Sequence, residues 1–242
     1  MQQSQHKLIS VGIFSKVYLV DNSFIRKVPK DNNRDNVQAI RNEATIYGLL
    51  GNNARIANCL SAGQNVNYVD LEYYPRGDLK AYLERNKGTI TSAFRMRVAR
   101  QVIEAVVEIH RKCIVHSDLA LRQFLLDTND NARLSDFAAS GYPGQCALGM
   151  ECASHYLPRD PDLPNTVESD LFALGSVLYE VMAGETPYHG KSDKEIETLY
   201  KEENFPAVNE FLCGNVIMGC WKREWRSAEE VLARYDEYAY SM

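Results

Sequence analysis

The chain has 242 residues, of which 45% are hydrophobic and 24% are charged, as in average soluble globular proteins and enough for a sizeable core. A formal net charge of -5 gives no basic surface for nucleic acid or for an anionic membrane. We expect one or two lobes without a disordered tail, and proteins or small molecules as partners rather than nucleic acid. We also expect the protein to be a monomer.

No segment of the sequence resembles a secretion signal or a membrane span. Residues 1–7 are polar, and no later run reaches the roughly eighteen apolar residues of a membrane-crossing helix. These features predict a cytoplasmic or otherwise intracellular protein. The cysteines form no Cys-x-x-Cys pair and have no nearby histidine pattern, so we interpret them as reduced thiols that mostly fill the core. They are Cys59, Cys113, Cys146, Cys152, Cys213 and Cys220.

The first third of the chain alternates apolar with polar or small residues, which predicts β-structure. The predicted elements are a hairpin over residues 8–20, strands over 24–28, 58–63 and 68–72, and one helix over 37–50. A Pro-Gly turn follows at Pro75 and Gly77. A change of pattern at this point predicts the boundary between two lobes, residues 1–74 and residues 75–242.

After this boundary the apolar residues recur about every 3.6 positions, which predicts helices. The predicted helices cover residues 79–86, 93–113 and 228–238. The helix over 93–113 carries an apolar stripe for the core, formed by Val98, Val102, Ala105, Val106 and Ile109. The whole pattern predicts an α+β fold with a small antiparallel β lobe and a larger, mainly α-helical lobe.

Two aspartates, Asp118 and Asp136, stand at the ends of short apolar runs. Ile114 and Val115 predict a buried strand before His116, while residues 124–126 and 133–135 predict a hairpin around a turn at 127–131. Such a hairpin would bring both carboxylates to one cleft, an arrangement suited to metal-assisted phosphoryl transfer. The alternative is that both are surface aspartates beside an ordinary hairpin.

These residues carry a resemblance to the eukaryotic protein kinases. The sequence His-Ser-Asp-Leu-Ala-Leu-Arg-Gln at 116–123 resembles their catalytic loop, and Asp-Phe-Ala at 136–138 resembles their Asp-Phe-Gly. Residues 168–188 resemble the Ser-Asp-x-Trp-Ser-x-Gly helix of the helical lobe and the Gly-x-x-Pro-Tyr turn after it. Small-molecule kinases of similar core lack this helix. The resemblance extends from about residue 8 to residue 238.

The resemblance implies ATP and Mg²⁺ as cofactors and a role for each matching residue. Lys27 would bind the α- and β-phosphates and pair with Glu43, and Asp118 would be the catalytic base. Asp136 and Gln123 would bind magnesium, and Arg122 would add positive charge near the γ-phosphate. Asp170 would be a buried anchor that bonds the catalytic-loop backbone. The implied ATP-binding residues are Ser10, Gly12, Ser15, Val17, Lys27, Leu71, Glu72, Tyr74, Asp78 and Leu125.

Several of these assignments have ordinary structural alternatives. Lys27 and Glu43 could each be solvated surface residues, and Asp78 could simply cap the helix that follows it, although it could also lie near the ribose. Leu71 would stand in the gatekeeper position, with backbone groups of Glu72 and Tyr74 free to bond adenine. His116 and His110 are expected to be structural.

The chain departs from the kinase pattern at six positions with chemical consequences. They are Ser10 and Ser15 for two glycines of the phosphate loop, Ile25 for an alanine over adenine, Ser117 for arginine, Gln123 for asparagine and Ala138 for glycine. In the resemblance, residues 139–153 are the activation segment, and loss of the arginine argues against control by its phosphorylation. Gln123 moves its amide oxygen outward by one methylene, so we expect a weak or absent second magnesium. Asp160 replaces the glutamate that closes this segment, and Arg226 is its expected partner.

The sequence therefore predicts a protein kinase of low activity that transfers the γ-phosphate of ATP to a protein hydroxyl. Ala120 lies where serine/threonine kinases carry a lysine, and Arg122 matches the tyrosine-kinase pattern instead. The stretch around Pro158 and Arg159 does not carry the tyrosine-kinase substrate signature, so the choice among Ser, Thr and Tyr stays open. One alternative is a pseudokinase that binds partners without transfer. Another is a small-molecule phosphotransferase.

Overall fold

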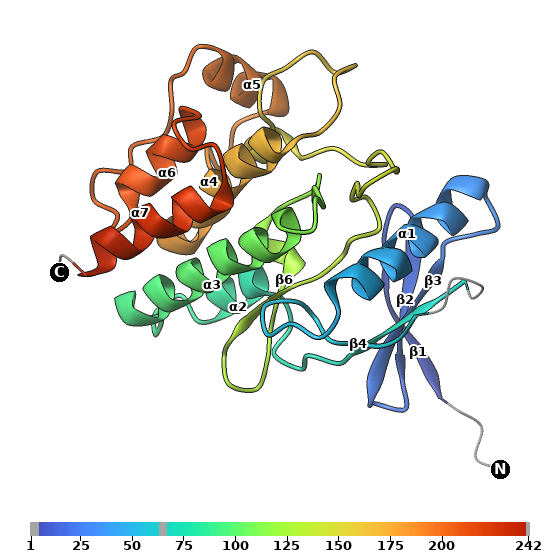
Figure 1. The fold of residues 1–242 in the computed structure, drawn as a ribbon. Coiled ribbons are helices and arrows are strands. Elements are labelled where there is room, and N and C mark those ends of the chain that lie inside the picture. Colours follow the sequence, from blue (N-terminus) through green and yellow to red (C-terminus); the bar gives the residue numbers. More distant parts are fainter. Residues whose placement is uncertain (1–4, 63–66, 241–242) are drawn as a thin grey trace.

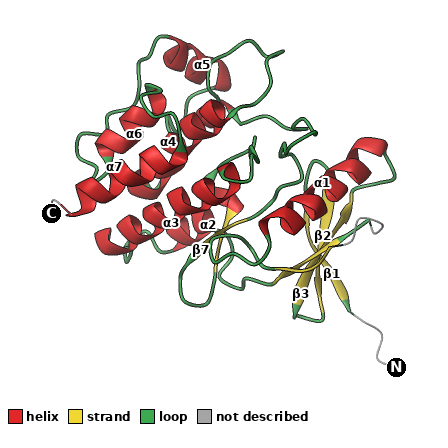
Figure 2. Ribbon diagram, in the orientation of Figure 1, coloured by secondary structure: helices red, strands yellow, loops and turns green. Residues whose placement is uncertain are grey.

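The computed structural model describes residues 5–62 and 67–240. Within them the five-stranded sheet lies at one end of the molecule and most helices at the other, as Figure 1 and Figure 2 show. The first part holds β1 (His6–Val11), β2 (Ser15–Val20), β3 (Phe24–Pro29), α1 (Arg34–Leu50), β4 (Cys59–Ala62) and β5 (Val69–Glu72). The predicted two-lobed α+β fold is confirmed.

The five strands form one antiparallel sheet in the order β1-β2-β3-β5-β4. The central strand, β3, pairs Lys27 with Val17 on one side and with Val69 on the other. Every residue of β1 is exposed, as an edge strand allows. The predicted strand over 58–63 is shorter, and Gly63 lies outside the described residues.

Helix α1 begins three residues before its predicted start, because Asn33 caps it. The Asn33 side chain accepts a hydrogen bond from the backbone N–H of Asp35 at 2.9 Å. Gly51 ends the helix with a φ of 62°, a value that favours glycine. The inward face carries Ile40, Glu43 and Ile46, all fully buried. The cap and the apolar stripe thus fix the position of Glu43.

The helical part contains α2 (Leu79–Arg85), α3 (Ser92–His110), α4 (Val167–Ala183), α5 (Asp193–Lys201), α6 (Gly214–Trp221) and α7 (Ala228–Tyr240). The predicted stripe of α3 is confirmed, since its five residues have no exposed surface. The helix ends at His110 rather than Cys113, whose φ of 55° is not helical. Helix α4 starts with a reciprocal capping box between Thr166 and Ser169.

Between α3 and α4 the chain forms the predicted hairpin, β6 (Phe124–Leu126) with β7 (Ala132–Leu134). Two single-turn 3-10 helices, η1 (Leu121–Gln123) and η2 (Ala153–His155), flank it in sequence. The strand predicted at Ile114 and Val115 is wrong. Val115 makes only an isolated bridge to Gly141, because the turn that ends α3 leaves no room for a longer strand.

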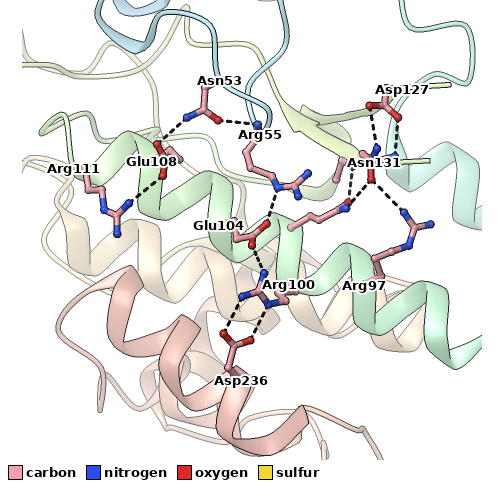
Figure 3. A network of polar contacts seen from close by, with 12 residues as sticks. Asn53, Arg55, Arg97, Arg100, Glu104, Glu108, Arg111, Asp127, Asn131 and Asp236 are labelled. Carbon is pink, nitrogen blue, oxygen red and sulfur yellow. Dashed lines mark hydrogen bonds and ion pairs between the residues drawn. The ribbon is translucent and has the colours of Figure 1, made fainter. Parts of the chain in front are cut away.

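A polar network ties the loop after α1 to the helical part (Figure 3). Asn53 donates to Glu108 at 2.7 Å, and Arg55 donates to Glu104 at 2.6 Å; both acceptors lie on α3. Arg100 joins Glu104 to Asp236 of α7. Single exposed ion pairs contribute little stability, but this network restrains the loop and with it the end of α1 that leads back to Glu43.

The cysteine prediction holds for only part of the set. Cys213 and Cys220 are buried in the helical part, but Cys113, Cys146 and Cys152 are exposed. Interpretation as core filler is therefore wrong for these three, which lie in turns and irregular segments rather than on the buried faces of helices. None of the helices in residues 5–62 and 67–240 is long and apolar enough to cross a membrane.

Candidate active site

Helix α4 holds the catalytic loop in place through Asp170. The Asp170 carboxylate, fully buried, accepts hydrogen bonds from the backbone N–H groups of His116 at 2.7 Å and Ser117 at 3.0 Å. The predicted anchoring role of Asp170 is confirmed. Ser117 takes a φ of 68°, an uncommon backbone for a residue with a side chain, which the two bonds stabilise. The His116 ring contacts the backbone oxygen of Ser135 at 3.1 Å and serves as structure.

Asp118 follows Ser117 in the catalytic loop, and its carboxylate accepts hydrogen bonds from two side chains. Arg122 binds both carboxylate oxygens, at 2.6 and 2.8 Å, through one terminal nitrogen. The Gln123 amide nitrogen donates to the same carboxylate at 2.7 Å. These bonds follow from η1, whose single turn returns Arg122 and Gln123 toward Asp118. They fix the carboxylate orientation, and they leave the Gln123 amide oxygen as an acceptor for another group.

Lys27 lies between two carboxylates, one from each side of the cleft. Its Nζ is 2.7 Å from Glu43 Oε2 and 2.7 Å from Asp136 Oδ1. The Lys27 and Glu43 side chains are 7% and 0% exposed, whereas that of Asp136 is 46% exposed. Thus the expected pair is present, and neither Lys27 nor Glu43 is a solvated surface residue. Asp136 alone of the three offers an oxygen to a ligand in the cleft.

The charges in this cluster shift each other's pKa values. Burial alone would lower the pKa of Lys27, but the negative charges of Asp136 and Glu43 outweigh burial and raise it. Burial raises the pKa of Glu43, with Lys27 opposing the shift. Burial also acts to raise the pKa of Asp136, but the Lys27 charge outweighs it and the net shift is downward. Lys27 therefore stays cationic and Asp136 stays anionic at neutral pH.

Phe137 locks the segment that delivers Asp136. Its ring is fully buried. The centroid of the ring lies 5.2 Å from that of Tyr47 on α1 and 5.5 Å from that of His116. The edge-to-face contact with Tyr47 and the tilted contact with His116 connect α1 to the catalytic loop, so the position of Glu43 and the orientation of Asp136 are set together. Asp136 itself takes a φ of 64°. Farther along, Ser140 donates to the backbone oxygen of His116 at 2.9 Å, which pins the start of the activation segment.

A pocket of about 380 Å³ lies between the sheet and the β6–β7 hairpin. All ten predicted ATP-binding residues line it, as do Arg122, Gln123 and Asp136. Residues that the sequence did not suggest also line it, namely Ile9, Tyr73, Gly77 and Ser135. Each of them is adjacent in sequence to a predicted residue; Ile9 lies on β1, and the other three lie in segments that follow strands. Ile25 lines the pocket beside Leu71, its partner across the β3–β5 ladder.

The backbone of the linker between lobes is partly engaged. The N–H of Glu72 donates to the oxygen of Asn58 at 2.9 Å, and the oxygen of Tyr74 accepts from Gly77 at 3.0 Å. The N–H of Glu72 and the carbonyl of Tyr74 are therefore not free to bond adenine. The predicted bonds to adenine are left to the carbonyl of Glu72 and the N–H of Tyr74. Asp78 caps α2 by accepting from the N–H of Ala81 at 2.9 Å while also lining the pocket, so both predicted uses fit.

A second, larger hollow of about 690 Å³ adjoins the first and contains Asp118. Gly12, Ser15, Arg122, Gln123 and Asp136 line both. One wall of the larger hollow is formed by the part of the activation segment between Ala147 and Cys152. Asp118 thus faces the larger hollow, and Asp136 faces both spaces.

The predicted ion pair of Asp160 with Arg226 is wrong. Both side chains are exposed, and no ion pair between them occurs in the described part of the chain. Asp160 instead accepts from the N–H of Asp162 at 3.0 Å. A buried pair that the sequence did not suggest closes the segment, since Arg159 binds Glu151 at 3.0 Å. The acid of this pair, Glu151, comes before Arg159 in the sequence. The kinase motif at the end of the segment instead places an acid after the arginine, at Asp160, so it gave no indication of Glu151.

Comparison with known proteins extends these observations. The family described as protein tyrosine and serine/threonine kinase matches residues 6–230. The chain is 31% identical over 172 residues to a probable serine/threonine-protein kinase KIN1 homolog of Enterocytozoon bieneusi, covering 69% of this chain and 29% of that protein. It is 24% identical to the serine/threonine-protein kinase PrkC of Bacillus subtilis (83% and 30%) and 29% identical to the serine/threonine-protein kinase ppk25 of Schizosaccharomyces pombe (86% and 53%). The chain spans about a third to a half of the length of these relatives.

Proposed function

Because the chain belongs to the protein tyrosine and serine/threonine kinase family, we propose that it is a magnesium-dependent kinase that transfers the γ-phosphate of ATP to a protein hydroxyl. The observation that carries this proposal is the Asp136–Lys27–Glu43 cluster, assembled across the cleft beside Asp118. We place the boundary between the two lobes after Tyr74, so that the nucleotide lies between them.

The adenine end of ATP fits the inner part of the smaller pocket. The Glu72 carbonyl and the Tyr74 N–H supply an acceptor and a donor, and the apolar walls come from Val17, Leu71 and Leu125. Ile25 narrows this space, because it is larger than alanine and faces the pocket from the same strand as Lys27. We therefore propose that ATP binds with reduced affinity.

The residues present fit a magnesium ion held together with the phosphates. Asp136 and Gln123 supply a carboxylate and an amide oxygen, which are the hard ligands that Mg²⁺ prefers. In the described residues no group of three or more His, Cys, Asp or Glu side chains could hold a metal unaided, as expected for an ion that needs substrate phosphates. When bound, the ion would neutralise charge on the β- and γ-phosphates.

The remaining residues position the reactants. Lys27, kept cationic by its two carboxylates, can bind the α- and β-phosphates. Asp118 orients the substrate hydroxyl in the larger hollow and accepts its proton, while Arg122 places a positive charge beside it. The relatives reported above are named serine/threonine kinases, so Ser and Thr peptides are the first substrates to test.

The second candidate function is a pseudokinase that binds nucleotide and a protein partner without transfer. One observation favours it specifically: Arg122 and Gln123 together make three bonds of 2.6 to 2.8 Å to Asp118, which occupies both of its oxygens. The three bonds leave about one of the four acceptor sites of the carboxylate, on Oδ1, for a substrate hydroxyl. Under this second proposal no substrate hydroxyl reaches that site.

Nucleotide binding can be tested by thermal unfolding in the presence of ATP, with magnesium and with chelator. At about 100 times Kd, ligand binding adds about 2.7 kcal/mol, which corresponds to a rise of about 5–10 °C for a domain of this size. We expect this rise for the wild type with magnesium and not for Asp136→Asn. Asp162→Asn, at an exposed position outside the pocket, is the matched control and should behave as the wild type. An equal rise with chelator would overturn the magnesium assignment.

A further inference from the structure

The thiol of Cys152 in the activation segment, the imidazole of His155 and a carboxylate of α4 lie next to one another. The Cys152 sulfur lies 3.3 Å from Nδ1 of His155, and Nε2 of the same ring lies 3.6 Å from Oε2 of Glu180. The His155 and Glu180 side chains are 2% and 3% exposed, while Cys152 is exposed to solvent. A nucleophile held by a base that a buried acid orients is the arrangement of activated cysteines.

Three elements fix this constellation. Cys152 immediately precedes η2, which contains His155, and Glu180 lies on α4. The Tyr200 hydroxyl of α5 donates to the backbone oxygen of Ser154 at 2.9 Å, which holds η2 in place. Glu180 also accepts from the backbone N–H of Leu121 at 3.2 Å. Contacts with Cys152 and Ser154 at Nδ1 thus position the imidazole, and Glu180 places a negative charge 3.6 Å from its Nε2.

The charges around the thiol favour its ionised form. Burial tends to raise the pKa of Cys152, but hydrogen bonding to His155 and the charge of Arg122 lower it to about 7. Burial tends to lower the pKa of His155, but Cys152 and Glu180 raise it to about 9. Ser154 contacts the same imidazole nitrogen at 3.0 Å, and Lys80 faces Glu180 from α2 at 4.0 Å. Near neutral pH a thiolate and an imidazolium thus coexist.

This thiol opens into the substrate side of the active site. Cys152 lines the 690 Å³ hollow that also contains Asp118 and Arg122. Burial acts to lower the pKa of Arg122, but Asp118 and, to a smaller extent, Cys152 raise it. Arg122 in turn binds Asp118 through both oxygens. Any group added to Cys152 would enter this hollow and change the charge next to Arg122.

We propose that Cys152, with His155 and Glu180, is a modification site that hydroperoxides oxidise to a sulfenic acid, and that this oxidation blocks the substrate side of the cleft. In the reaction the thiolate sulfur attacks one peroxide oxygen, an S–O bond forms and the O–O bond breaks. Sulfur loses two electrons to the peroxide. The hydroxide that leaves takes a proton from the His155 imidazolium, so hydrogen peroxide yields the sulfenic acid and water.

The modification itself does not depend on phosphoryl transfer, whereas its consequence rests on the proposed kinase function. Oxidation converts an anion beside Arg122 into a neutral group and adds an oxygen to the wall that faces Asp118. Transfer to a peptide should fall, while nucleotide affinity should change little because Cys152 does not line the smaller pocket. Reduction by a dithiol should restore transfer.

The first test is the rate of alkylation of Cys152 by iodoacetamide as a function of pH, followed by peptide mass spectrometry. The matched control is a synthetic peptide of residues 147–157, which has the same thiol without the fold. An ordinary thiol with a pKa near 8.5 is about 0.3% ionised at pH 6, against about 9% for a pKa of about 7. After correction for the lower nucleophilicity of the weaker base, Cys152 should react about sixfold faster than the peptide at pH 6 and no faster at pH 8.5.

The second test treats the protein with hydrogen peroxide and traps sulfenic acid with dimedone. The adduct should form at Cys152 in the wild type and in Cys146→Ser, which removes another exposed thiol of the same segment, and should form more slowly in His155→Gln. In Cys152→Ser the ratio of transfer rates with and without peroxide should stay near one. Because His155 is buried, its variant is interpreted only if its unfolding temperature is unchanged.

The outcomes separate the two proposals. An adduct at Cys152 in a protein without transfer would support the modification site and contradict the kinase function. A rate at pH 6 equal to that of the peptide, or an adduct at Cys146 in preference to Cys152, would overturn the modification site. Equal loss of transfer in the wild type and in Cys152→Ser would overturn its effect on the cleft.

Discussion

Replacement of Lys27 by Met should destabilise the protein by an amount that depends on pH. Met keeps much of the side-chain volume but leaves the Glu43 carboxylate, fully buried, without its cation. Removal of one partner of a buried pair costs about 3–5 kcal/mol, which corresponds to a fall of about 6–20 °C in Tm for a domain of this size. An exposed ion pair contributes only about 0–1 kcal/mol, so a loss of this size in the free energy of unfolding would show that the Lys27–Glu43 pair is buried.

The sign of the pH dependence follows from Glu43. Its pKa is already raised by burial, and loss of Lys27 raises it further. A group whose pKa is raised on folding contributes stability below its unfolded pKa of about 4.3, and this stability is lost as pH rises through the folded pKa. The penalty of Lys27→Met should therefore be largest at pH 8 and smaller at pH 5. Urea unfolding followed by tryptophan fluorescence at both pH values measures it.

Two further variants make this prediction specific. Lys7→Met, at an exposed position on β1, should change the unfolding free energy by less than about 0.5 kcal/mol. The double variant Lys27→Met with Glu43→Leu removes both charges and should recover much of the loss. A free energy for Lys27→Met within about 0.5 kcal/mol of the wild type at pH 8 would refute the reasoning, since it would mean that Glu43 retains solvation or another cation.

Three more variants address the remaining assignments. Ile25→Ala should tighten ATP binding by on the order of tenfold, the effect of relieving a crowded apolar pocket, as measured by nucleotide titration; unchanged or weaker binding would show that Ile25 does not crowd adenine. Gln123→Asn should lower the magnesium concentration for half-maximal transfer, because the amide oxygen returns to its usual reach; an unchanged requirement would remove Gln123 from the metal site. Asp170→Asn should lower the free energy of unfolding by about 1–3 kcal/mol, because one backbone N–H of the catalytic loop loses its acceptor. It should also slow transfer without changing ATP affinity; urea unfolding measures the first effect, and transfer assays with nucleotide titration measure the second.

Local patterns in the sequence were sufficient to predict the elements that hold the site. Alternation predicted the hairpin before Lys27, the 3.6-residue period predicted the buried stripe of α3, and the Ser-Asp motif located Asp170. Element ends were less predictable where a single side chain decides them, as Asn33 does for α1 by capping it early. The turn after α3 likewise replaced the strand predicted at Val115 by one bridge to Gly141.

The features that the sequence did not predict depend on contacts between distant segments. Glu180 was expected only as part of a helix, and its approach to His155 requires that η2 pack on α4. Glu151 and Arg159 form their pair because the activation segment folds back on itself. The hydrogen bonds to Asp118 depend on the turn of η1, which brings Arg122 and Gln123 to one carboxylate. No spacing rule in the sequence describes such contacts.

The most direct test of the account is transfer of radiolabelled phosphate from ATP to Ser- and Thr-containing peptides by the wild type and by Asp118→Asn. We expect magnesium-dependent transfer by the wild type and a loss on the order of 10²–10⁴-fold in the variant, the usual contribution of a positioned base. Magnesium-dependent ATP binding should be the same in both, because Asp118 does not line the smaller pocket. Wild type that binds ATP but transfers no phosphate to any peptide or protein would contradict the kinase assignment and favour the pseudokinase.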